Sequence, residues 1–479
     1  MHFQISEFGR IHDVARGQTW GPERLSAEVD ARTATLTAAG IEPGSLIAIA
    51  HSGSVHFFAD LFAAWQRGCT AVCIDTALTA NEIQTLVDFA MPAALLVDGI
   101  NPAIVTQIPV LDLARDSATA HSPAGPAGDP ENPALVLFTS GTTGTPKGVV
   151  LSFRALLNRM ALNRAAMGAA GSTKTLVTLP TSFGHGLIGN ALTPLMAGGD
   201  IVLHPGGLEL ARNLGRVIDE FGIRFLSSVP SFWRIALKFA PAPSGNSLAR
   251  IHVGSAPLGV ALWTQIAEWA RTDVVNCYGI TELANWVAGA SSQKDGISEG
   301  LVGKPWGDEV AVKTSSGDTR KSGDGELLVR SRSAMSAYLR RPDLTAAAFA
   351  DGWYLTGDTG HIDQAGLIRL TGRIKDEINR AGVKVQPAEI DALLETHPGV
   401  SEACVFGIPD RVSGEIVAAA VHFAPGGTVD VEALRQWCTT KVRRDAIPEK
   451  WFVVEKLPRN ERGKVNRQTV RRMLIGEFE

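Results

Sequence analysis

The chain has 479 residues, 45% of them hydrophobic, and carries a formal net charge of −4. This length exceeds the size at which one hydrophobic core usually keeps growing, so at least two domains are expected. Because Lys plus Arg nearly equals Asp plus Glu, no overall field favours nucleic acid or an anionic membrane, and we expect neither as a partner.

The first residues, MHFQISEFGR, lack the basic and then apolar layout of a secretory signal, and no apolar run approaches the ~20 residues that span a bilayer. A cytoplasmic protein is therefore expected. The cysteines are odd in number and scattered, which fits neither a disulfide framework nor a zinc site with paired ligands. We expect most of them to be buried thiols: Cys69, Cys73, Cys277, Cys404 and Cys438.

Helical and strand patterns alternate along much of the chain. The elements expected first are helix 23–39, strand 45–50, helix 55–67, strand 69–75, helix 81–89, strand 93–98 and, after a surface connection at 122–133, strand 134–140. Further on we expect strand 176–180, a helix-like stretch at 186–199, and strands 200–205, 225–230 and 251–257. This alternation predicts parallel sheets with helices on their faces, and small residues that end the last two strands are candidate pocket walls.

The composition becomes charged and turn-rich after about Leu370, and a shorter set of alternating elements follows. This shift predicts a domain boundary that separates residues 1–372 from residues 373–479. The expected fold is therefore α/β, with a large N-terminal domain of layered sheets flanked by helices and a small α+β C-terminal domain.

The stretch FTSGTTGTPKGVV, which begins at Phe138, combines glycines and hydroxyls with a single lysine, Lys147. Backbone N–H groups and hydroxyls can surround phosphate oxygens while the ammonium supplies charge. A Walker loop needs Gly before the lysine and Ser or Thr after it, whereas here Pro146 precedes and Gly148 follows. A phosphate loop of another kind is predicted, and a solvated turn is the alternative.

The segment NCYGITELAN, residues 276–285, places a hydroxyl and a carboxylate side by side. Thr281 could donate to a phosphate and Glu282 could hold Mg²⁺, which takes oxygen ligands and bridges to phosphates. The alternative is an ordinary helix start with Thr281 as its N-cap.

Three further polar positions follow. Asp358, in WYLTGDTGHID, is suited to accept hydrogen bonds from both hydroxyls of a ribose, unless it only forms a turn. TGRIKDEI supplies Arg373, and LPRNERGKVNR supplies Lys464, although a lysine in such a loop is commonly just solvated.

These ordered motifs, FTSGTTGTPKGVV, YGITE, YLTGD, GRIKDEI and PRNERGK, resemble the adenylate-forming superfamily of acyl- and aryl-CoA synthetases, adenylation domains and luciferases. The resemblance covers nearly the whole chain. It implies an AMP-forming carboxylate–CoA ligase that uses ATP and Mg²⁺ to make an acyl-AMP and then transfers the acyl group to coenzyme A.

The resemblance also implies roles for individual residues. The β- and γ-phosphates of ATP would contact the loop residues Thr139, Ser140, Gly141, Thr142, Thr143, Gly144 and Lys147. The adenine would be lined by Ser255, Ala256, Pro257, Asn276, Tyr278 and Gly279. The ribose would be bound by Asp358 and Arg373, and the candidate catalytic residues are Thr281, Glu282, which would also bind the metal, His185 and Lys464.

In the same family the C-terminal domain is mobile and joined by a hinge, here at Lys375, and it would bring Lys464 to the carboxylate in the first step only. The pantetheine arm would pass Ala381 and Gly382, where family members usually carry two glycines. Asn460 replaces a threonine common in relatives, and neither departure removes a reactive group.

The acyl pocket would be bordered by His185 and completed by Leu187, Ile188, Asn190, Val229, Pro230, Ala284, Asn285 and Trp286. Gly184 stands where amino-acid-activating relatives carry Asp, so an α-amino acid is disfavoured because its ammonium would be unpaired. No Arg lies in ITELANWVAGAS, which weakens a dicarboxylate. A monocarboxylate remains, either aryl or short to medium acyl. Trp286 could instead be a core residue.

Free coenzyme A is the expected acceptor, and the phosphopantetheine of a carrier protein is the alternative. The basic segments 441–444 and 459–467 could meet the 3′-phosphate of coenzyme A, dock an acidic carrier protein, or be a solvated face. A nucleotide-binding sensor without turnover is a further alternative, although it has no need of Lys464.

Overall fold

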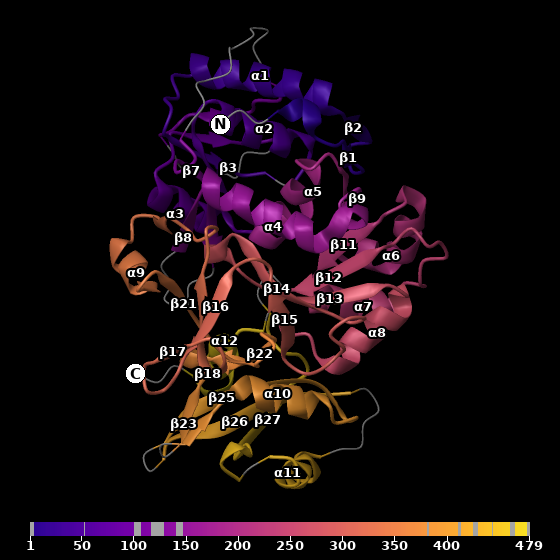
Figure 1. Ribbon diagram of the computed structural model, residues 1–479, viewed down its shortest axis with the longest axis vertical. Coiled ribbons are helices and arrows are strands. Elements are labelled where there is room, and N and C mark those ends of the chain that lie inside the picture. Colours follow the sequence, from indigo (N-terminus) through magenta and orange to yellow (C-terminus); the bar gives the residue numbers. More distant parts are fainter. Residues whose placement is uncertain are drawn as a thin grey trace.

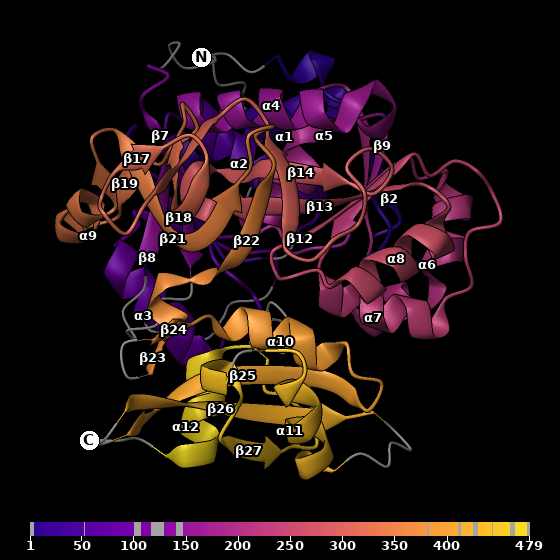
Figure 2. The ribbon, with the colours of Figure 1, turned by 60° about the horizontal axis from the view of Figure 1, so that its bottom comes forward.

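The computed structural model describes residues 4–51, 53–99, 107–115, 129–139, 147–380, 383–410, 413–424, 430–442, 444–459 and 465–476. Three β-sheets lie in this described part. Two of them, with their helices, form a large body, and the third forms a smaller body at its lower end (Figures 1 and 2). The expected α/β fold, with a large N-terminal and a small C-terminal part, is confirmed.

The N-terminal sheet has the strand order β19-β8-β7-β4-β3-β5-β6, and its central strands β7, β4, β3 and β5 are parallel. Its strands are β3 (Leu46–Ile49), β4 (Thr70–Cys73), β5 (Ala94–Leu96), β6 (Val110–Leu111), β7 (Pro133–Thr139), β8 (Lys147–Ser152) and β19 (Ala337–Tyr338). The helices that precede or follow them are η1 (Ile5–Glu7), α1 (Pro22–Ala38), α2 (Val55–Gln66), α3 (Ala80–Ala90) and α4 (Phe153–Gly171). These bounds confirm the early elements expected from the sequence to within two residues.

The second sheet joins a parallel half to an antiparallel half. The half that runs from β1 to β13 contains β1 (Ile11–Asp13), β2 (Gln18–Trp20), β9 (Lys174–Val177), β10 (Asp200–Leu203), β11 (Phe225–Ser228), β12 (Arg250–Gly254) and β13 (Asp273–Ile280). The antiparallel half contains β14 (Asn285–Ser291), β15 (Leu301–Pro305), β16 (Glu309–Lys313), β17 (Thr319–Arg320), β18 (Gly323–Arg330), β20 (Phe349–Ala350), β21 (Trp353–Ile362) and β22 (Ile368–Arg373).

Helices cover both faces of the parallel half. One face packs against α6 (Gly207–Phe221), α7 (Pro230–Phe239) and α8 (Val260–Ala270). The helix α6 is amphipathic, since Leu210, Leu214 and Val217 fall on one side and are buried. The other face meets η2 (His185–Leu192), a π-helix that continues into α5 (Thr193–Leu195). The remaining short helices of this body are η3 (Thr281–Leu283) and α9 (Pro342–Ala347).

The third sheet contains β23 (Ile378–Arg380), β24 (Val383–Val385), β25 (Val400–Asp410), β26 (Gly414–Phe423) and β27 (Lys450–Val453). Its helices are η4 (Ile374–Asp376), α10 (Pro387–Glu395), α11 (Val431–Thr439), η5 (Arg444–Ala446) and α12 (Arg467–Ile475). An ion pair of 3.4 Å joins Arg234 Nη2 of α7 to Glu395 Oε2 of α10. The boundary between residues 372 and 373 stays a prediction, as does the hinge at Lys375.

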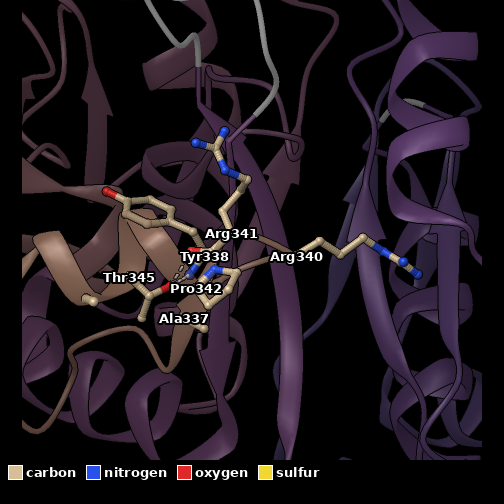
Figure 3. A pocket seen from close by; sticks show the side chains of 7 residues that line it. Ala337, Tyr338, Arg340, Arg341, Pro342 and Thr345 are labelled. Atoms are coloured by element: carbon tan, nitrogen blue, oxygen red, sulfur yellow. Dashed lines mark hydrogen bonds between the residues drawn. The ribbon is translucent and has the colours of Figure 1, made fainter.

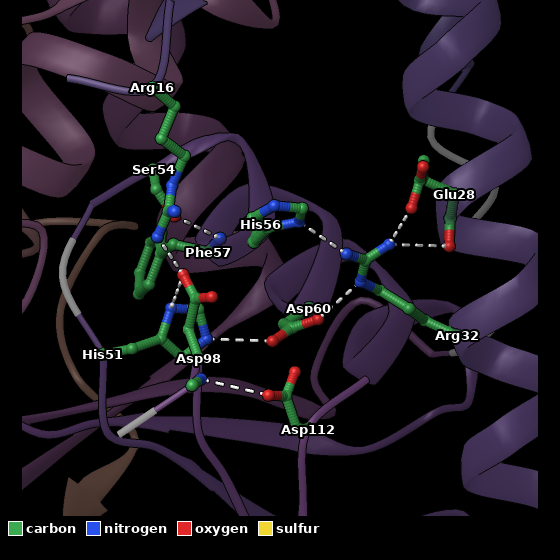
Figure 4. Close-up of polar contacts among 11 residues, drawn as sticks. Arg16, Glu28, Arg32, His51, Ser54, His56, Phe57, Asp60, Asp98 and Asp112 are labelled. Atoms are coloured by element: carbon green, nitrogen blue, oxygen red, sulfur yellow. Dashed lines mark hydrogen bonds and ion pairs between the residues drawn. The ribbon is translucent and has the colours of Figure 1, made fainter. Parts of the chain in front are cut away.

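A buried polar network holds the first two helices together (Figure 4). Arg32 of α1 is fully buried, and its Nε lies 2.7 Å from Asp60 Oδ1 of α2. Asp60 Oδ2 also binds His51 Nε2 at 2.8 Å. The pKa of the nearby His56 is lowered by burial and then by the charge of Arg32. This network therefore pairs its charges internally and acts as structural packing.

Two other sequence expectations can be compared with the structure. All five cysteines are free and buried, as expected. Within the described residues, no helix is both long and apolar enough to cross a bilayer.

Candidate functional site

A carboxylate with two donors lies where β13, β21 and β22 meet. Asp358, on β21, is buried, and its Oδ2 accepts a 2.6 Å hydrogen bond from the hydroxyl of Tyr278 on β13. Its Oδ1 lies 2.7 Å from Nε of Arg373, the last residue of β22. Burial and the neighbouring Asp358 charge raise the pKa of Tyr278 well above its usual value, so the phenol stays a neutral donor. The structure thus brings together three residues that are separated along the sequence.

A second carboxylate, Glu282, is held by a tyrosine. Glu282 lies in η3, and its Oε1 accepts a 2.7 Å hydrogen bond from the Tyr338 hydroxyl. Tyr338 is in turn hydrogen-bonded to Tyr354, and burial together with the Glu282 charge raises the pKa of Tyr338. The sequence analysis missed both tyrosines, and no spacing signal connects them to Glu282.

The alternative reading of Thr281 as the N-cap of an ordinary helix is wrong. Only a three-residue turn, η3, follows, and Ile280 occupies its cap position. Ala284 then adopts a φ of 60° and Asn285 a φ of 131°, so the chain reverses into β14 rather than continuing as a helix. Positive φ values at non-glycine residues store strain, which is common at functional sites. The turn presents Thr281 and Glu282 at the end of β13.

Cations cluster around these carboxylates. Lys147 begins β8, and its Nζ lies 5.6 Å from the ring centroid of Tyr338. The pKa of Lys375 is lowered by partial burial and by the charges of Arg373 and Lys147. Such mutual repulsion between cations favours an anionic ligand, because an anion relieves it.

Part of the predicted nucleotide site lies outside the described residues. Thr139 ends β7 opposite Lys147, and its hydroxyl lies 3.5 Å from the Lys147 carbonyl oxygen. Between these two, no structure is described for Ser140, Gly141, Thr142, Thr143 and Gly144. Gly382 and Lys464 also lie outside the described part. The roles predicted for these residues stay predictions.

The predicted adenine residues lie at the carboxyl ends of β12 and β13. Ser255 has a φ of 67°, and its hydroxyl lies 2.8 Å from Nδ1 of His185. Ala256 is half-buried, while Pro257 and Gly279 are exposed. Asn276 is buried, and its amide N–H donates to the Leu301 carbonyl at 2.8 Å, so this donor is occupied within the protein. A role for Asn276 in binding adenine therefore stays a prediction.

The buried residue His185 links the adenine side to the predicted acyl pocket. It starts η2, and its two ring nitrogens lie 2.8 Å from Ser255 Oγ and 2.6 Å from Ser227 Oγ. Asn190, one turn further along η2, donates to the Ser227 carbonyl at 2.7 Å. These bonds fix η2 across the ends of β11 and β12.

Trp286 is on β14 and packs against this helix. Its ring centroid lies 5.3 Å from that of His185, and the side chain is 2% exposed. A Cβ at Gly189 of η2 would lie only 2.4 Å from Asn285 Nδ2 and 2.9 Å from the Trp286 ring. Gly189 therefore permits the close approach of β14, and Trp286 is both buried and next to His185.

Arg159 supports this region from α4 and was missed by the sequence analysis. It is fully buried, and its Nε and Nη1 donate to the carbonyl oxygens of Leu283 and Trp286 at 3.0 and 2.6 Å. Its Nη2 lies 2.7 Å from Asp308 Oδ2, which is also buried. Arg159 thus fixes the backbone on both sides of the turn that carries Asn285, although an arginine inside a helix gives no such signal in sequence.

A surface hollow lies behind Tyr338. Figure 3 shows its lining, in which Arg340 and Arg341 extend in different directions from the loop after β19. The hollow contains none of the residues predicted for nucleotide or acid. The phenol of Tyr338 points instead to Glu282, so the hollow lies on the outer side of the site wall.

The carboxylate of Glu282 is suited to bind a magnesium ion whose other ligands are phosphate oxygens. Tyr338 holds one of its carboxylate oxygens, and within the described residues no hydrogen bond to the other is recorded. The described chain contains no cluster of three or more His, Cys, Asp or Glu able to enclose a metal. Mg²⁺ commonly uses one or two carboxylates together with phosphate oxygens and waters, and this arrangement suits that mode.

Comparison with family models gives two matches. A model of AMP-binding enzymes matches residues 9–339, and a model of the AMP-binding enzyme C-terminal domain matches residues 389–464.

Individual relatives cover nearly the whole chain. Oxalate–CoA ligase of Arabidopsis thaliana is 30% identical over 90% of this chain and 89% of its own length. The fatty acid–[acyl-carrier-protein] ligase ScoC of Streptomyces coeruleorubidus is 29% identical over 97% of this chain and 93% of its own. The structure of o-succinylbenzoate CoA synthetase from Bacillus subtilis, in complex with its acyl-adenylate intermediate, has a TM-score of 0.86 and 23% identity, covering 97% of this chain and 95% of that one.

Proposed function

This chain belongs to the AMP-binding enzyme family and is an ATP- and Mg²⁺-dependent carboxylate–coenzyme A ligase, and we propose which of its residues perform the two half-reactions. The assignment rests on the observation that Glu282 and Lys147, distant along the chain, both lie against Tyr338. Asp358 binds Tyr278. Tyr278 and Tyr338 both interact electrostatically with the buried Tyr354. This arrangement of two carboxylates and a cation suits ATP and Mg²⁺. An aryl or a short to medium acyl acid is proposed as the second substrate, because Gly184 offers no partner for an ammonium and residues 280–291 contain no Arg for a second carboxylate.

In the first half-reaction, the acid's carboxylate attacks the α-phosphorus of ATP and pyrophosphate leaves. Attack by an anion on a polyphosphate needs cations that offset the repulsion. We assign the β- and γ-phosphates to the loop ending at Lys147, the ribose hydroxyls to Asp358, and the α-phosphate to Thr281. When bound at Glu282, Mg²⁺ neutralises phosphate charge. Lys464 supplies the remaining positive charge near the reacting carboxylate.

In the second half-reaction, a thiol captures the acyl carbon of the adenylate and AMP leaves. Lys464 is not needed in this step, so rotation of the C-terminal domain about Lys375 can withdraw it and admit the pantetheine arm past Gly382. Burial and then the charges of Arg373 and Lys147 lower the pKa of Lys375, which agrees with a partly buried position beside other cations at this junction.

A carrier protein is the second candidate acceptor. The relative ScoC is named as a fatty acid–[acyl-carrier-protein] ligase and is 29% identical to this chain. A carrier-borne phosphopantetheine would use the same channel. The two acceptors differ in what surrounds the thiol, since coenzyme A brings a 3′-phosphate and a carrier protein brings an acidic surface.

The acceptor is tested by a panel of acids in two assays. Acid-dependent exchange of pyrophosphate into ATP first identifies which acids are activated, and the best acid is then offered with free coenzyme A or with a phosphopantetheinylated carrier protein. We expect thioester formation with free coenzyme A. Faster acylation of the carrier protein at equal concentration would contradict that choice, and no exchange with any acid would favour a sensor without turnover.

The ribose assignment predicts a specific defect. Asp358→Asn preserves the shape of the side chain but removes the charge that pairs with Arg373, so AMP and ATP should bind roughly tenfold more weakly or worse, since hydrogen bonds to charged groups contribute about 1.5–3 kcal/mol. Calorimetric titration with AMP measures this directly. Asp324→Asn is the matched control, because Asp324 is an exposed carboxylate that pairs only with His361 on the surface. Equal AMP affinities in both variants would contradict the assignment.

A further inference from the structure

A further buried histidine, His252, lies on β12 and has no assigned role. It is fully buried, and neither of its ring nitrogens has a hydrogen-bond partner in the described part of the chain. A buried polar group without a partner is destabilising, so native proteins rarely leave one. The two unpartnered nitrogens therefore point to a ligand that pairs with them.

Three aromatic rings enclose the imidazole of His252. The ring centroids of Phe225, Trp286 and Trp306 lie 4.8, 4.7 and 5.4 Å from it. None of these rings hydrogen-bonds to the histidine nitrogens, although the two tryptophans each carry an indole N–H donor.

On the face that His252 occupies, β12 places no side chain between His252 and Ser255, and a Cβ at Gly254 would lie 2.9 Å from the Cys277 carbonyl oxygen. Side chains two residues apart on a strand share a face, and the next residue on the face of His252 is Gly254, which has no side chain. Ser255 follows, about 10 Å along the strand from His252 at ~3.3 Å per residue. His252 thus lies below the position that Ser255 and His185 occupy at the mouth of the pocket.

His185 and His252 share two neighbours, Ser227 and Trp286. Ser227, whose hydroxyl binds His185 Nε2 at 2.6 Å, is the residue of β11 that pairs in register with His252. The Trp286 ring lies 5.3 Å from His185 and 4.7 Å from His252, so it contacts both. A group held beside His185 can therefore extend along Trp286 toward His252.

Other unpartnered polar atoms gather near this path. They belong to η2, β11 and β14, the elements that contact one another around Ser227 and Gly189. Within the described residues these buried atoms are Asn190 Oδ1, Ser228 Oγ, Asn285 Nδ2 and Trp286 Nε1. A purely hydrocarbon acyl chain would leave all of them buried and unpaired, whereas a polar group could satisfy several.

The surroundings of His252 favour an uncharged partner. Its pKa lies well below the usual value because of burial and then the charges of Arg250 and His185, so the ring is neutral, with one donor and one acceptor nitrogen. Arg250 is the cation on the same strand, and it already pairs with Asp273 at 3.1 Å and with the Ala166 carbonyl. This arginine is therefore not available to neutralise a second carboxylate.

We propose that His252 forms a polar floor of the acid pocket together with Asn190, Ser228 and Trp286. This floor determines which carboxylic acid binds, and the proposal rests on the carboxylate activation proposed above. The substrate class is a short carboxylic acid that carries an uncharged hydroxyl or carbonyl at the end remote from the reacting carboxylate. This narrows the aryl and short to medium acyl acids to those whose far end can hydrogen-bond.

The test compares matched acids with the full-length protein. The pairs are benzoate with 4-hydroxybenzoate and butanoate with 4-hydroxybutanoate, and succinate is included as a dicarboxylate of the same length. We expect kcat/KM for acid-dependent pyrophosphate exchange to favour the hydroxylated member of at least one pair by about 100-fold, because the plain acid leaves buried groups unpaired. His252→Phe should reduce that ratio at least about tenfold, and His252→Gln, which keeps a donor and an acceptor, should retain part of it.

Phe225→Leu is the matched control, because it alters the same cluster without removing a polar group. It should change kcat/KM for both acids of a pair alike and leave their ratio unchanged. Thermal unfolding of each variant identifies any that fail to fold. If His252→Phe does not fold, the ratio of kcat/KM values for the two acids of a pair, measured in His252→Gln, tests the proposal instead. A plain acid or succinate preferred by the native protein, or an unchanged ratio in His252→Phe, overturns the polar floor while leaving the ligase intact. Absence of exchange with every acid contradicts the proposed function itself.

Discussion

Lys464→Ala is expected to abolish acyl-AMP formation, with a loss of at least about 10²–10³-fold, as is typical when a group that stabilises transition-state charge is removed. Thioester formation from synthetic acyl-AMP should be much less affected, since the second half-reaction does not need this cation. The described residues on either side of 460–464 make specific contacts. Arg459 bridges to Val465 and binds Glu402 at 2.6 Å, and Arg467 of α12 binds Asp391 at 2.6 Å.

The two half-reactions are measured separately. Pyrophosphate exchange reports the first, and release of AMP from supplied acyl-AMP and coenzyme A reports the second. Lys456→Ala serves as the control, because this lysine lies in the same C-terminal part but outside the PRNERGK motif. Equal loss in both half-reactions would exclude a role for Lys464 confined to adenylation.

Arg159→Met is expected to lower the free energy of unfolding by about 3–5 kcal/mol, since removing one partner leaves a buried charge uncompensated. Asp308 would lose its 2.7 Å ion pair, and the carbonyl oxygens of Leu283 and Trp286 would lose their donors. These carbonyls flank the turn that carries Asn285. The variant should therefore lose activity even at temperatures at which it remains folded.

Denaturant unfolding measures the stability change, and Arg154→Met on the same helix is the control. Arg154 pairs with Glu131 at 2.6 Å and donates to the Arg332 carbonyl, but its side chain is 28% exposed and that of Glu131 is 59% exposed, so the change should cost about 1 kcal/mol. An equal decrease in the free energy of unfolding of the two variants would contradict the stabilising role assigned to the buried contacts of Arg159.

The candidate nucleotide-binding residues could be proposed from the sequence, because each motif contains side chains suited to one part of the nucleotide. Asp358 follows a glycine in a turn-rich strand, and Glu282 follows a hydroxyl, so single segments suggested ribose and Mg²⁺. Most strands from β3 to β12 were also predictable, since buried parallel strands appear as apolar runs bounded by small residues, whereas β6 and β8 were not expected. The order and register of the strands, which place β4 beside β7 and β15 beside β22, depend on long-range pairing that a local pattern does not contain.

The residues around the predicted acid pocket were harder to predict from the sequence, for physical reasons. The segment after Thr281 looked like a helix start, yet Ala284 and Asn285 take positive φ values that short-range patterns do not predict for these residues. His252 sits in an ordinary strand pattern, and only the three-dimensional arrangement shows that aromatic rings deprive its nitrogens of partners. Arg159 gave no signal because its acceptors are backbone carbonyls more than a hundred residues away.

The most direct test of the whole account is to capture the intermediate. The full-length protein is incubated with ATP, Mg²⁺ and a hydroxylated short acid without any thiol, and the products are identified by mass spectrometry before and after coenzyme A is added. We predict acyl-AMP and pyrophosphate first, and then acyl-CoA with release of AMP. Formation of ADP and phosphate, or no acid-dependent product at all, would contradict the account.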